Sequence, residues 1–387
     1  MTESLSMGRP RTVLHLVNCL RRGGAELQML EFLRGINRKR YRPLVGCLVK
    51  EGNLLEELEK LKIPVIEVPV RPKLYSPKSI LSMRSFTRIL REERVEIIHT
   101  QDLYSHLVGI PTGRLAGVKG VIVGRLDLCH FYGLPHRAFL RLLSNFATVN
   151  LANSEAVRQM LVKTERISPK KVEVIYNGVN LERFDRCRAG RPPFGLRGSE
   201  PVVGIIANLN PVKGHVYFLE AAARVARRVS QVRFLLIGDG VLRPDLEVRA
   251  EQLGIADRVV FAGSRQDIPY LLKWTDVVVL SSLAEGFSNA VLEGMAAGKP
   301  VVATRVGGNA EAVVEGETGF IVPPRNADAL ADRILLLLGD EEVSRRMGDA
   351  GRRRIEKLFS VDRMISDTEA LYDRILSRRD RQEREGR

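Results

Sequence analysis

"DVVVLSSLAEGFSNAVLEGMAAGKPVVAT" occupies residues 276–304 and holds one complete strand–helix–strand pattern. It opens with a short β-branched run, crosses a polar loop, continues as an amphipathic helix and closes with a second β-branched run. Ser288 or Asn289 can cap the helix, and Gly298 followed by Lys299-Pro300 is a typical helix exit. A strand, a helix and a strand in this order predict a βαβ unit with parallel strands.

The same alternation extends in both directions from this stretch. We expect amphipathic helices at Ala25–Ile36 and Lys78–Glu93 between the β-branched runs of the first half. Those runs are "TVLHLV", "RPLVGCLV", "VEIIHT", "GVIVGR" and "VNLANS", and the second half continues with "VVGIIA", "VRFLLIGDG", "RVVFAG", "DVVVLSS", "KPVVAT" and "GFIVPP". The pattern predicts an α/β protein with two doubly wound, Rossmann-like domains in tandem.

Domain boundaries follow from the places where the alternation stops. "RCRAGRPPFGLRGSEP" is rich in Gly, Pro and Arg, so residues 186–200 are expected to link an N-terminal domain, 1–185, to a C-terminal domain, 201–360. Residues 361–387 are expected to form an amphipathic helix that packs back on the N-terminal domain, followed by a frayed charged tail that starts at Ser377. Ligands of such sheets bind beyond the carboxyl ends of the strands, so two facing domains would enclose a cleft there.

Composition fits a globular protein of a reducing compartment. The chain has 387 residues, of which 44% are hydrophobic and 28% charged. Its four cysteines, at 19, 47, 129 and 187, have neither disulfide-framework nor zinc-ligand spacing. The first apolar run, Val13–Val17, is interpreted as a buried strand rather than a signal segment, and no apolar run has the roughly 18 residues of a membrane span. We expect a cytoplasmic protein.

The positive charge is concentrated in the first half of the chain. Residues 1–190 carry 32 basic and 18 acidic side chains, a net charge of +14, whereas residues 191–387 carry 29 and 28, a net charge of +1. Two interpretations stay open: a solvated basic surface, or an N-terminal domain that faces an anionic membrane or an acidic acceptor.

Chemistry-bearing residues cluster where strands end. Gly23-Gly24 precedes a helix and suits close approach of a phosphate, although a tight turn explains it as well. Lys213 lies in a strand-to-helix loop, where it is either a phosphate ligand or an exposed lysine. Glu285 precedes the start of the helix near Ser288, and Glu293 lies one turn inside it. These glutamates can accept hydrogen bonds from sugar hydroxyls, or merely complement the helix dipole.

With these residues in view, the chain resembles the retaining nucleotide-sugar glycosyltransferases of the GT-B fold, family 4. The resemblance rests on an ordered set of segments and is strongest over residues 150–325. That set is "LANSEAVR", "VIYNGVNLERF", "GDGVLRPDLE", "VVFAGSRQDIPYLLKWTDVVVLSS" and the E-x7-E motif in "EGFSNAVLE".

The resemblance implies a role for each candidate residue. Glu293 would bind the nucleotide ribose and Glu285 the donor sugar, while the backbone of Phe287, Ser288 and Asn289 would contact sugar and diphosphate. Lys213 and the Gly23-Gly24 loop would hold the diphosphate, with the base near Gly263–Arg265. Asn153-Ser154 and Asn177-Gly178 also match the family, but a helix cap and a left-handed turn account for them.

Two departures from the family pattern affect these roles. Relatives often carry an arginine in the phosphate loop where this chain has Asn208 and Asn210, so neutralisation would depend more on Lys213, with Arg21 or Arg22 as possible substitutes. Relatives also often show H-x-H where this chain has His99 and Gln101. An amide can position a sugar hydroxyl but cannot take its proton. The resemblance implies that the leaving phosphate takes this proton instead, so protein groups would mainly position and stabilise charge. Asp102 and His106 are further candidates that a capping and a helix-face role explain equally well.

The expected function is therefore a metal-independent, hexosyltransferase-like glycosyltransferase. It would move a sugar from a nucleotide diphosphate-sugar to a hydroxyl of a glycan or lipid-linked acceptor, in cell-envelope or exopolysaccharide synthesis, and could act as a peripheral protein at the inner face of the membrane. No cofactor and no metal are expected, since no Asp-x-Asp or His cluster is present in the loops. The alternatives are a GT-B epimerase or phosphorylase, or a non-catalytic binding protein. Nucleic acid is not an expected partner, because the arginines are not interleaved with aromatics.

Overall fold

The computed structural model describes residues 9–68, 77–127, 134–188 and 190–385, which form two compact units. The first unit comprises the chain up to Tyr176 together with the segment from Asp362 onward, and the second comprises Asn177–Val361. The predicted linker, 186–200, therefore belongs to the second unit. Local contacts explain this: Tyr270 donates its hydroxyl to the carbonyl of Arg191, and the Arg265 guanidinium lies over the ring of Phe194.

The first unit is built on a parallel sheet of seven strands in the order β3-β2-β1-β4-β5-β6-β7 among the residues described. Its strands are β1 (Arg11–Val17), β2 (Tyr41–Cys47), β3 (Val65–Glu67), β4 (Val95–Thr100), β5 (Gly120–Arg125), β6 (Val149–Ala152) and β7 (Val172–Val174). Its helices are α1 (Gly24–Gly35), α2 (Leu55–Lys60), α3 (Pro77–Glu92), α4 (Leu103–Ala116), α5 (Leu134–Ser144), α6 (Glu155–Gln159) and α15 (Val361–Glu385), with a π-helical turn at Met160–Thr164 and a 3-10 turn at Pro169–Lys171.

The second unit has a parallel sheet of six strands in the order β10-β9-β8-β11-β12-β13, counted over the described chain. Its strands are β8 (Val202–Ile206), β9 (Arg233–Ile237), β10 (Val259–Gly263), β11 (Val277–Leu280), β12 (Val301–Thr304) and β13 (Gly319–Val322). Its helices are α7 (Glu182–Asp185), α8 (His215–Arg228), α9 (Arg243–Gln252), α10 (Ile268–Lys273), α11 (Asn289–Ala296), α12 (Asn309–Ala312), α13 (Ala327–Gly339) and α14 (Glu341–Leu358), with short turns at Pro211–Lys213 and Ala256–Arg258.

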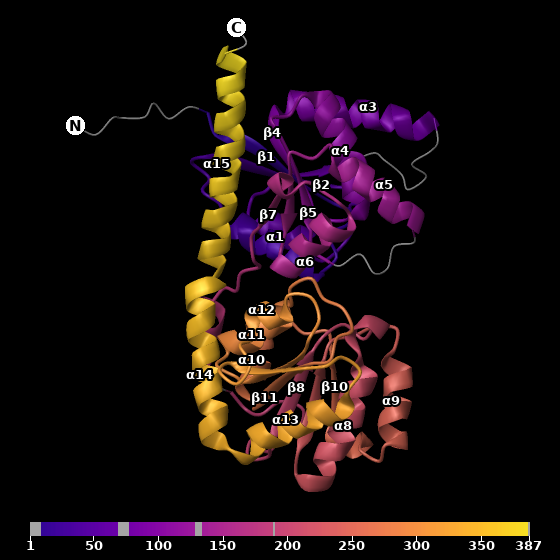
Figure 1. Cartoon of the computed structure of the whole chain (residues 1–387), viewed down its shortest axis with the longest axis vertical. Helices are drawn as coiled ribbons and strands as arrows, with labels where there is room; N and C mark the ends of the chain where they lie inside the picture. The colour runs from indigo at the N-terminus through magenta and orange to yellow at the C-terminus, as the bar shows by residue number, and fades with distance from the viewer. Residues whose placement is uncertain (1–8, 69–76, 128–133, 189, 386–387) are drawn as a thin grey trace, which may run out of the picture. The chain divides into compact units, whose positions relative to one another are not determined.

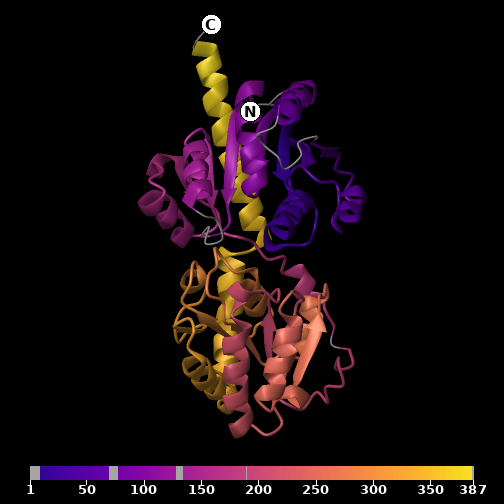
Figure 2. The ribbon, with the colours of Figure 1, turned by 90° about the vertical axis from the view of Figure 1, so that its right-hand side faces the viewer.

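Both sheets reverse their winding direction once. In the first sheet the chain moves outward from β1 to β3 and then returns to pair β4 with β1; in the second it moves from β8 to β10 and returns to pair β11 with β8. Figures 1 and 2 show helices on both faces of each sheet. The predicted pair of doubly wound α/β domains is confirmed. In such folds ligands bind at the carboxyl ends of the strands where the winding reverses, which here lies between β1 and β4 and between β8 and β11.

The last helix completes the first unit. On α15, Leu371, Tyr372 and Ile375 are buried, and Tyr41 in β2 donates a hydrogen bond of 2.6 Å to Asp373. The predicted frayed tail is wrong, because α15 continues to Glu385. Asp380 forms ion pairs with Arg11 and Lys119 of the first sheet, which hold this part of the helix.

Two further facts concern the described residues alone. None of their helices has the length and apolar character of a membrane span. Cys19, Cys47 and Cys187 are free, whereas Cys129 lies outside the described residues.

We expect the buried face of α15 to stabilise the first sheet. Leu371 is 1% exposed, so Leu371→Ala removes packed methyl groups and should lower the free energy of unfolding by about 2–5 kcal/mol. Ser377→Ala, on the exposed side of the same helix, should change it by less than about 0.5 kcal/mol. Hydrogen–deuterium exchange in peptides that cover β1 and β4 measures the difference, and equal exchange in the two variants would contradict the assignment.

Candidate functional site

In the second unit, Lys213 and Glu285 meet beyond the carboxyl ends of β8 and β11, where the winding of the sheet reverses. Lys213 ends the short turn after β8, and Glu285 lies in the loop after β11. The Lys213 Nζ donates to Glu285 Oε1 at 2.6 Å, and the Ser282 hydroxyl donates to the same oxygen at 2.6 Å. The two side chains are 24% and 10% exposed, so the pair is largely shielded from water.

The backbone beneath this pair is closely packed. The Ser281 hydroxyl donates to the Lys213 carbonyl at 3.0 Å, and the Leu283 N–H donates to the Val212 carbonyl at 2.7 Å. A Cβ at Gly214, which has φ +63°, would lie 2.2 Å from the Ser281 carbonyl oxygen, and one at Gly307 would lie 1.8 Å from that of Glu285. Only glycine permits such approaches, so these contacts fix the loops that carry both charges.

The amino end of α11 lies beside this pair in the sequence. Ser288 rather than Asn289 is its cap, since the Ser288 hydroxyl accepts from the Val291 N–H at 3.4 Å. The ring of Phe287 is buried against Phe359, which leaves only its backbone for a ligand. The amino end of a helix attracts anions through its first N–H groups and its dipole.

Asn177 holds this segment in place, which sequence reasoning missed. Its amide donates to the Phe287 carbonyl at 3.3 Å and to Asn289 Oδ1 at 2.8 Å. The left-handed turn expected at Asn177-Gly178 is wrong, because neither residue has a positive φ. The cap expected at Ser154 is confirmed, since its hydroxyl accepts from the Val157 N–H at 3.2 Å.

The other predicted residues of the second unit differ in how far they are buried. Glu293 is partly buried, one turn inside α11 as predicted. Arg265 follows the edge strand β10 and forms an ion pair of 2.7 Å with Asp267, which raises the pKa of the guanidinium. Asn208 is exposed, and Asn210 Oδ1 is a buried acceptor without a partner three residues before Lys213.

In the first unit, Gly23-Gly24 begins α1 at the carboxyl end of β1. Gly23 is the cap, without a side-chain hydrogen bond, and a Cβ there would lie 2.4 Å from Glu26 Oε2. The chain's own carboxylate, Glu26, thus occupies the space above this glycine. Burial raises the pKa of Glu26, and the nearby charge of Asp102 raises it further.

The two arginines considered as substitutes for a phosphate-loop arginine already have carboxylate partners. Arg21 donates to Glu51 at 2.6 Å and Arg22 to Glu57. Each side chain would have to leave its partner to reach a phosphate.

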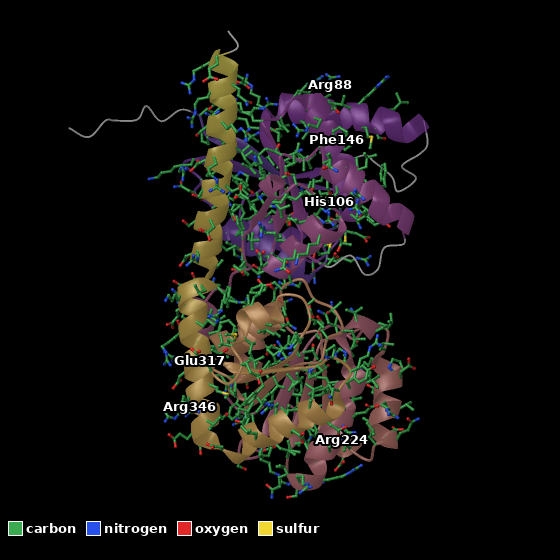
Figure 3. All side chains as sticks on the ribbon, in the orientation of Figure 1. Arg88, His106, Phe146, Arg224, Glu317 and Arg346 are labelled. Atoms are coloured by element: carbon green, nitrogen blue, oxygen red, sulfur yellow. The ribbon has the colours of Figure 1, made fainter. Side chains whose placement is uncertain are left out.

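The end of β4 carries Gln101, which is 9% exposed, directly after His99 and Thr100. Asp102 caps α4 in a reciprocal capping box with Ser105 and also accepts from the Asn18 N–H at 2.7 Å. His106 is buried with its Nδ1 2.7 Å from the Thr100 hydroxyl, and burial lowers its pKa well below the ordinary value. Asp102 and His106 therefore have structural roles. His106 is labelled in Figure 3.

Each half of the chain matches one family model. Residues 22–183 match Glycosyltransferase Family 4, and residues 189–354 match Glycosyl transferases group 1. Among curated relatives, N-acetyl-alpha-D-glucosaminyl L-malate synthase of Bacillus anthracis is 28% identical over 78% of this chain and 81% of its own. The UDP-Gal:alpha-D-GlcNAc-diphosphoundecaprenol alpha-1,3-galactosyltransferase of Escherichia coli is 26% identical over 90% of this chain and 96% of its own.

Solved structures agree with these matches. HepE of Anabaena, in complex with UDP, superimposes with a TM-score of 0.82 at 25% identity, over 94% of this chain and 99% of its own. A glycosyltransferase from Rickettsia africae has a TM-score of 0.84 at 23% identity, over 95% and 99%, which shows the shared fold alone. The chain belongs to the family 4 glycosyltransferases and is a transferase of the GT-B fold.

Proposed function

We propose that the protein transfers a sugar, with retention of configuration, from a nucleoside diphosphate sugar to a hydroxyl of a glycan or lipid-linked acceptor. The observation that carries this proposal is the Lys213–Glu285 pair beyond the carboxyl ends of β8 and β11, in the loop that precedes the capped amino end of α11. A cation, a carboxylate and helix N–H groups together suit a ligand with phosphates and hydroxyls. HepE bound to UDP, and the UDP-galactose donor in the name of the Escherichia coli relative, support a UDP-sugar as donor.

In this proposal Lys213 and the amino end of α11 bind the diphosphate, and Glu293 binds the ribose. Glu285 accepts from Lys213 in the structure and turns to a hydroxyl of the donor sugar when phosphate binds the lysine. The base lies near Arg265, and the Gly23-Gly24 loop receives phosphate only after Glu26 moves. Asn210 Oδ1, unpaired and buried, is available to a donor group of the ligand.

The proposed chemical step exchanges one bond at the anomeric carbon for another. The bond from this carbon to the diphosphate oxygen breaks, the acceptor oxygen bonds on the same face, and the acceptor proton goes to the leaving phosphate. Lys213 and the α11 N–H groups stabilise the charge that builds on the diphosphate. Gln101 positions a hydroxyl without exchanging a proton. No step requires a protein-bound metal ion.

The experiment that tests this function is release of UDP from UDP-glucose or UDP-galactose with and without acceptor glycans or undecaprenyl-diphosphate sugars, in the presence of EDTA. UDP release that requires an acceptor, with an α-linked product, is expected. Glu285→Gln should lower turnover at least about tenfold with little loss of UDP affinity, because its contact strengthens only as the sugar develops charge. Isomerised donor without transfer would favour an epimerase, phosphate-dependent cleavage a phosphorylase, and binding without turnover a binding protein.

Binding of UDP tests the donor site separately. Lys213→Ala and Glu293→Ala should each weaken binding by about 1.5–3 kcal/mol, the contribution of a charge-assisted hydrogen bond. Lys273→Ala removes an exposed lysine of the same unit and serves as the matched control. Isothermal titration calorimetry measures all three, and unchanged affinity in both site variants would remove these residues from the donor site.

We further propose that the first unit contacts an anionic membrane, where a lipid-linked acceptor and the cell-envelope pathway would place it. From the sequence, the expected contact surface is the segment 71–91, where cations accompany a stripe of apolar side chains. The structure changes this expectation. Phe86 and Leu90 of α3 are buried in the core, and Met83 and Ile89 pack against it, so this apolar stripe serves the fold. Lys73, Leu74 and Tyr75 lie outside the described residues.

Apolar side chains on neighbouring helices support the proposal instead. Leu115, Leu142 and Phe146 are 63%, 57% and 55% exposed, and the Arg114 guanidinium donates to the Phe146 carbonyl at 2.7 Å. Leu81 and Phe139 are also exposed, as are the cations Arg84, Arg88 and Arg141. Figure 3 labels Arg88 on α3 and Phe146 after α5. Exposed apolar side chains that share helices with cations suit the lipid interface, where each cation near the surface contributes about 1 kcal/mol. Arg88 would first have to leave Glu92, with which it forms an ion pair of 2.7 Å.

Co-sedimentation with vesicles tests the membrane proposal. Binding should require anionic lipid, weaken as salt rises, and fall when Leu142 and Phe146 are replaced by Ser. Leu336→Ser, at an exposed leucine of the second unit, should leave binding unchanged. Equal sedimentation with neutral vesicles, or none with anionic ones, would indicate a soluble acceptor.

A further inference from the structure

A chain of buried polar side chains connects the last helix to Gln101. Tyr372 of α15 is fully buried, with its hydroxyl 3.0 Å from His99 Nδ1 and 3.3 Å from His15 Nε2. The other ring nitrogen of His15, Nδ1, lies 3.3 Å from Gln101 Nε2. His15 and His99 are opposite each other on the paired strands β1 and β4, with ring centroids 5.0 Å apart.

The placement of the Gln101 side-chain amide sets the direction of every hydrogen bond in this hydrogen-bond chain. Gln101 Nε2 can only donate, so His15 Nδ1 accepts and the His15 proton is on Nε2. His15 Nε2–H then donates to the Tyr372 oxygen, and the Tyr372 hydroxyl donates to His99 Nδ1. Each of these three donors has one acceptor, and no two donors face each other.

Burial keeps the side chains of this hydrogen-bond chain in their neutral forms. It lowers the pKa of His99 to about 3 and that of His15 well below its ordinary value, and it raises the pKa of Tyr372. Both imidazoles are therefore neutral and the phenol is protonated near neutral pH, so the hydrogen-bond directions do not change there.

The orientation of the Gln101 amide has a consequence for recognition. With Nε2 turned to His15, the carbonyl oxygen Oε1 faces Gly124, where an added Cβ would lie only 3.2 Å from it. Oε1 is the acceptor end of the amide, so a substrate hydroxyl that reached it would have to donate. The reversed amide would present a donor there and would favour a different partner.

We propose that Tyr372 is a positioning residue that, through His15, fixes the Gln101 amide with Nε2 toward His15 and the acceptor oxygen Oε1 away from it. The proposal rests on the proposed function in that Gln101 contacts a substrate hydroxyl. Without the Tyr372 hydroxyl, the proton on His15 Nε2 has no acceptor. His15 then moves its proton to Nδ1, donates to Gln101 Oε1, and the amide turns over.

The test compares Tyr372→Phe with Tyr41→Phe. Tyr41 also bonds α15, through Asp373 at 2.6 Å, and its ring lies 5.7 Å from that of Tyr372, but its hydroxyl is outside the chain that leads to Gln101. Nitrogen-15 NMR of the six histidines shows which ring nitrogen of His15 carries the proton. We expect Nε2–H in the wild type and in Tyr41→Phe, and Nδ1–H in Tyr372→Phe.

Kinetics supply the second measurement. Tyr372→Phe should lower kcat about tenfold or more with little change in KM for the donor, whereas Tyr41→Phe should retain the wild-type kcat. Gln101→Leu removes the donor at the other end of the chain, so His15 should then populate both tautomers; this variant also serves if Tyr372→Phe does not fold.

An unchanged His15 tautomer in both Tyr372→Phe and Gln101→Leu would overturn the hydrogen-bond chain. A changed tautomer with wild-type kcat would overturn the positioning role. The tautomer is measured without substrate, so a wild-type protein that transfers no sugar would overturn the proposed function while the NMR result still decides the hydrogen-bond chain.

Discussion

The reversal of winding direction in each sheet is the constraint on which the candidate residues of each unit depend. Where β4 returns to β1 and β11 returns to β8, the loops that follow the two strands leave toward opposite faces. Loops follow β4, β8 and β11 at that place and present backbone and side chains there. Lys213, Glu285 and Gln101 all follow strands of these two pairs. Glycines tighten the arrangement, because Gly214 and Gly307 let backbones approach to distances that any side chain would prevent.

The second feature common to both units is that charged groups at these edges are already partnered. Lys213 is held by Glu285, Arg22 by Glu57, and the glycine at the start of α1 is covered by Glu26. An isolated charge in a shielded place is costly, so each cation is held by a carboxylate of the same unit. In the proposed reaction a diphosphate would take the place of such a carboxylate, which favours ligands with more negative charge than a carboxylate.

Sequence patterns were sufficient for the longer strands of both sheets and insufficient for the two shortest, which are the edges of the first sheet. "VEIIHT" and "GVIVGR" coincide with β4 and β5, because buried parallel strands require continuous β-branched runs. The three-residue strands β3 and β7 were missed, since so short a strand leaves no periodic pattern. The positions of the candidate lysine, the two glutamates and the helix cap could be predicted from local spacing. The roles of Asn177, Glu26 and Tyr372 could not, because each depends on a contact that only the folded chain creates: Asn177 lies 110 residues from Phe287, and Tyr372 lies 357 residues from His15.

The position of α15 in the chain has a consequence for biosynthesis. The second unit is one continuous segment, whereas the first unit starts the chain and needs its final helix. A ribosome that adds about 5–20 residues per second takes roughly ten to forty seconds to make the segment in between. During this time the surface of β1, β2 and β4 that later covers Tyr372 lacks its partner, although the second unit can already fold. The part of the protein that emerges first is thus completed last, and a nascent chain is most exposed to chaperones and to aggregation at the surface that α15 will cover.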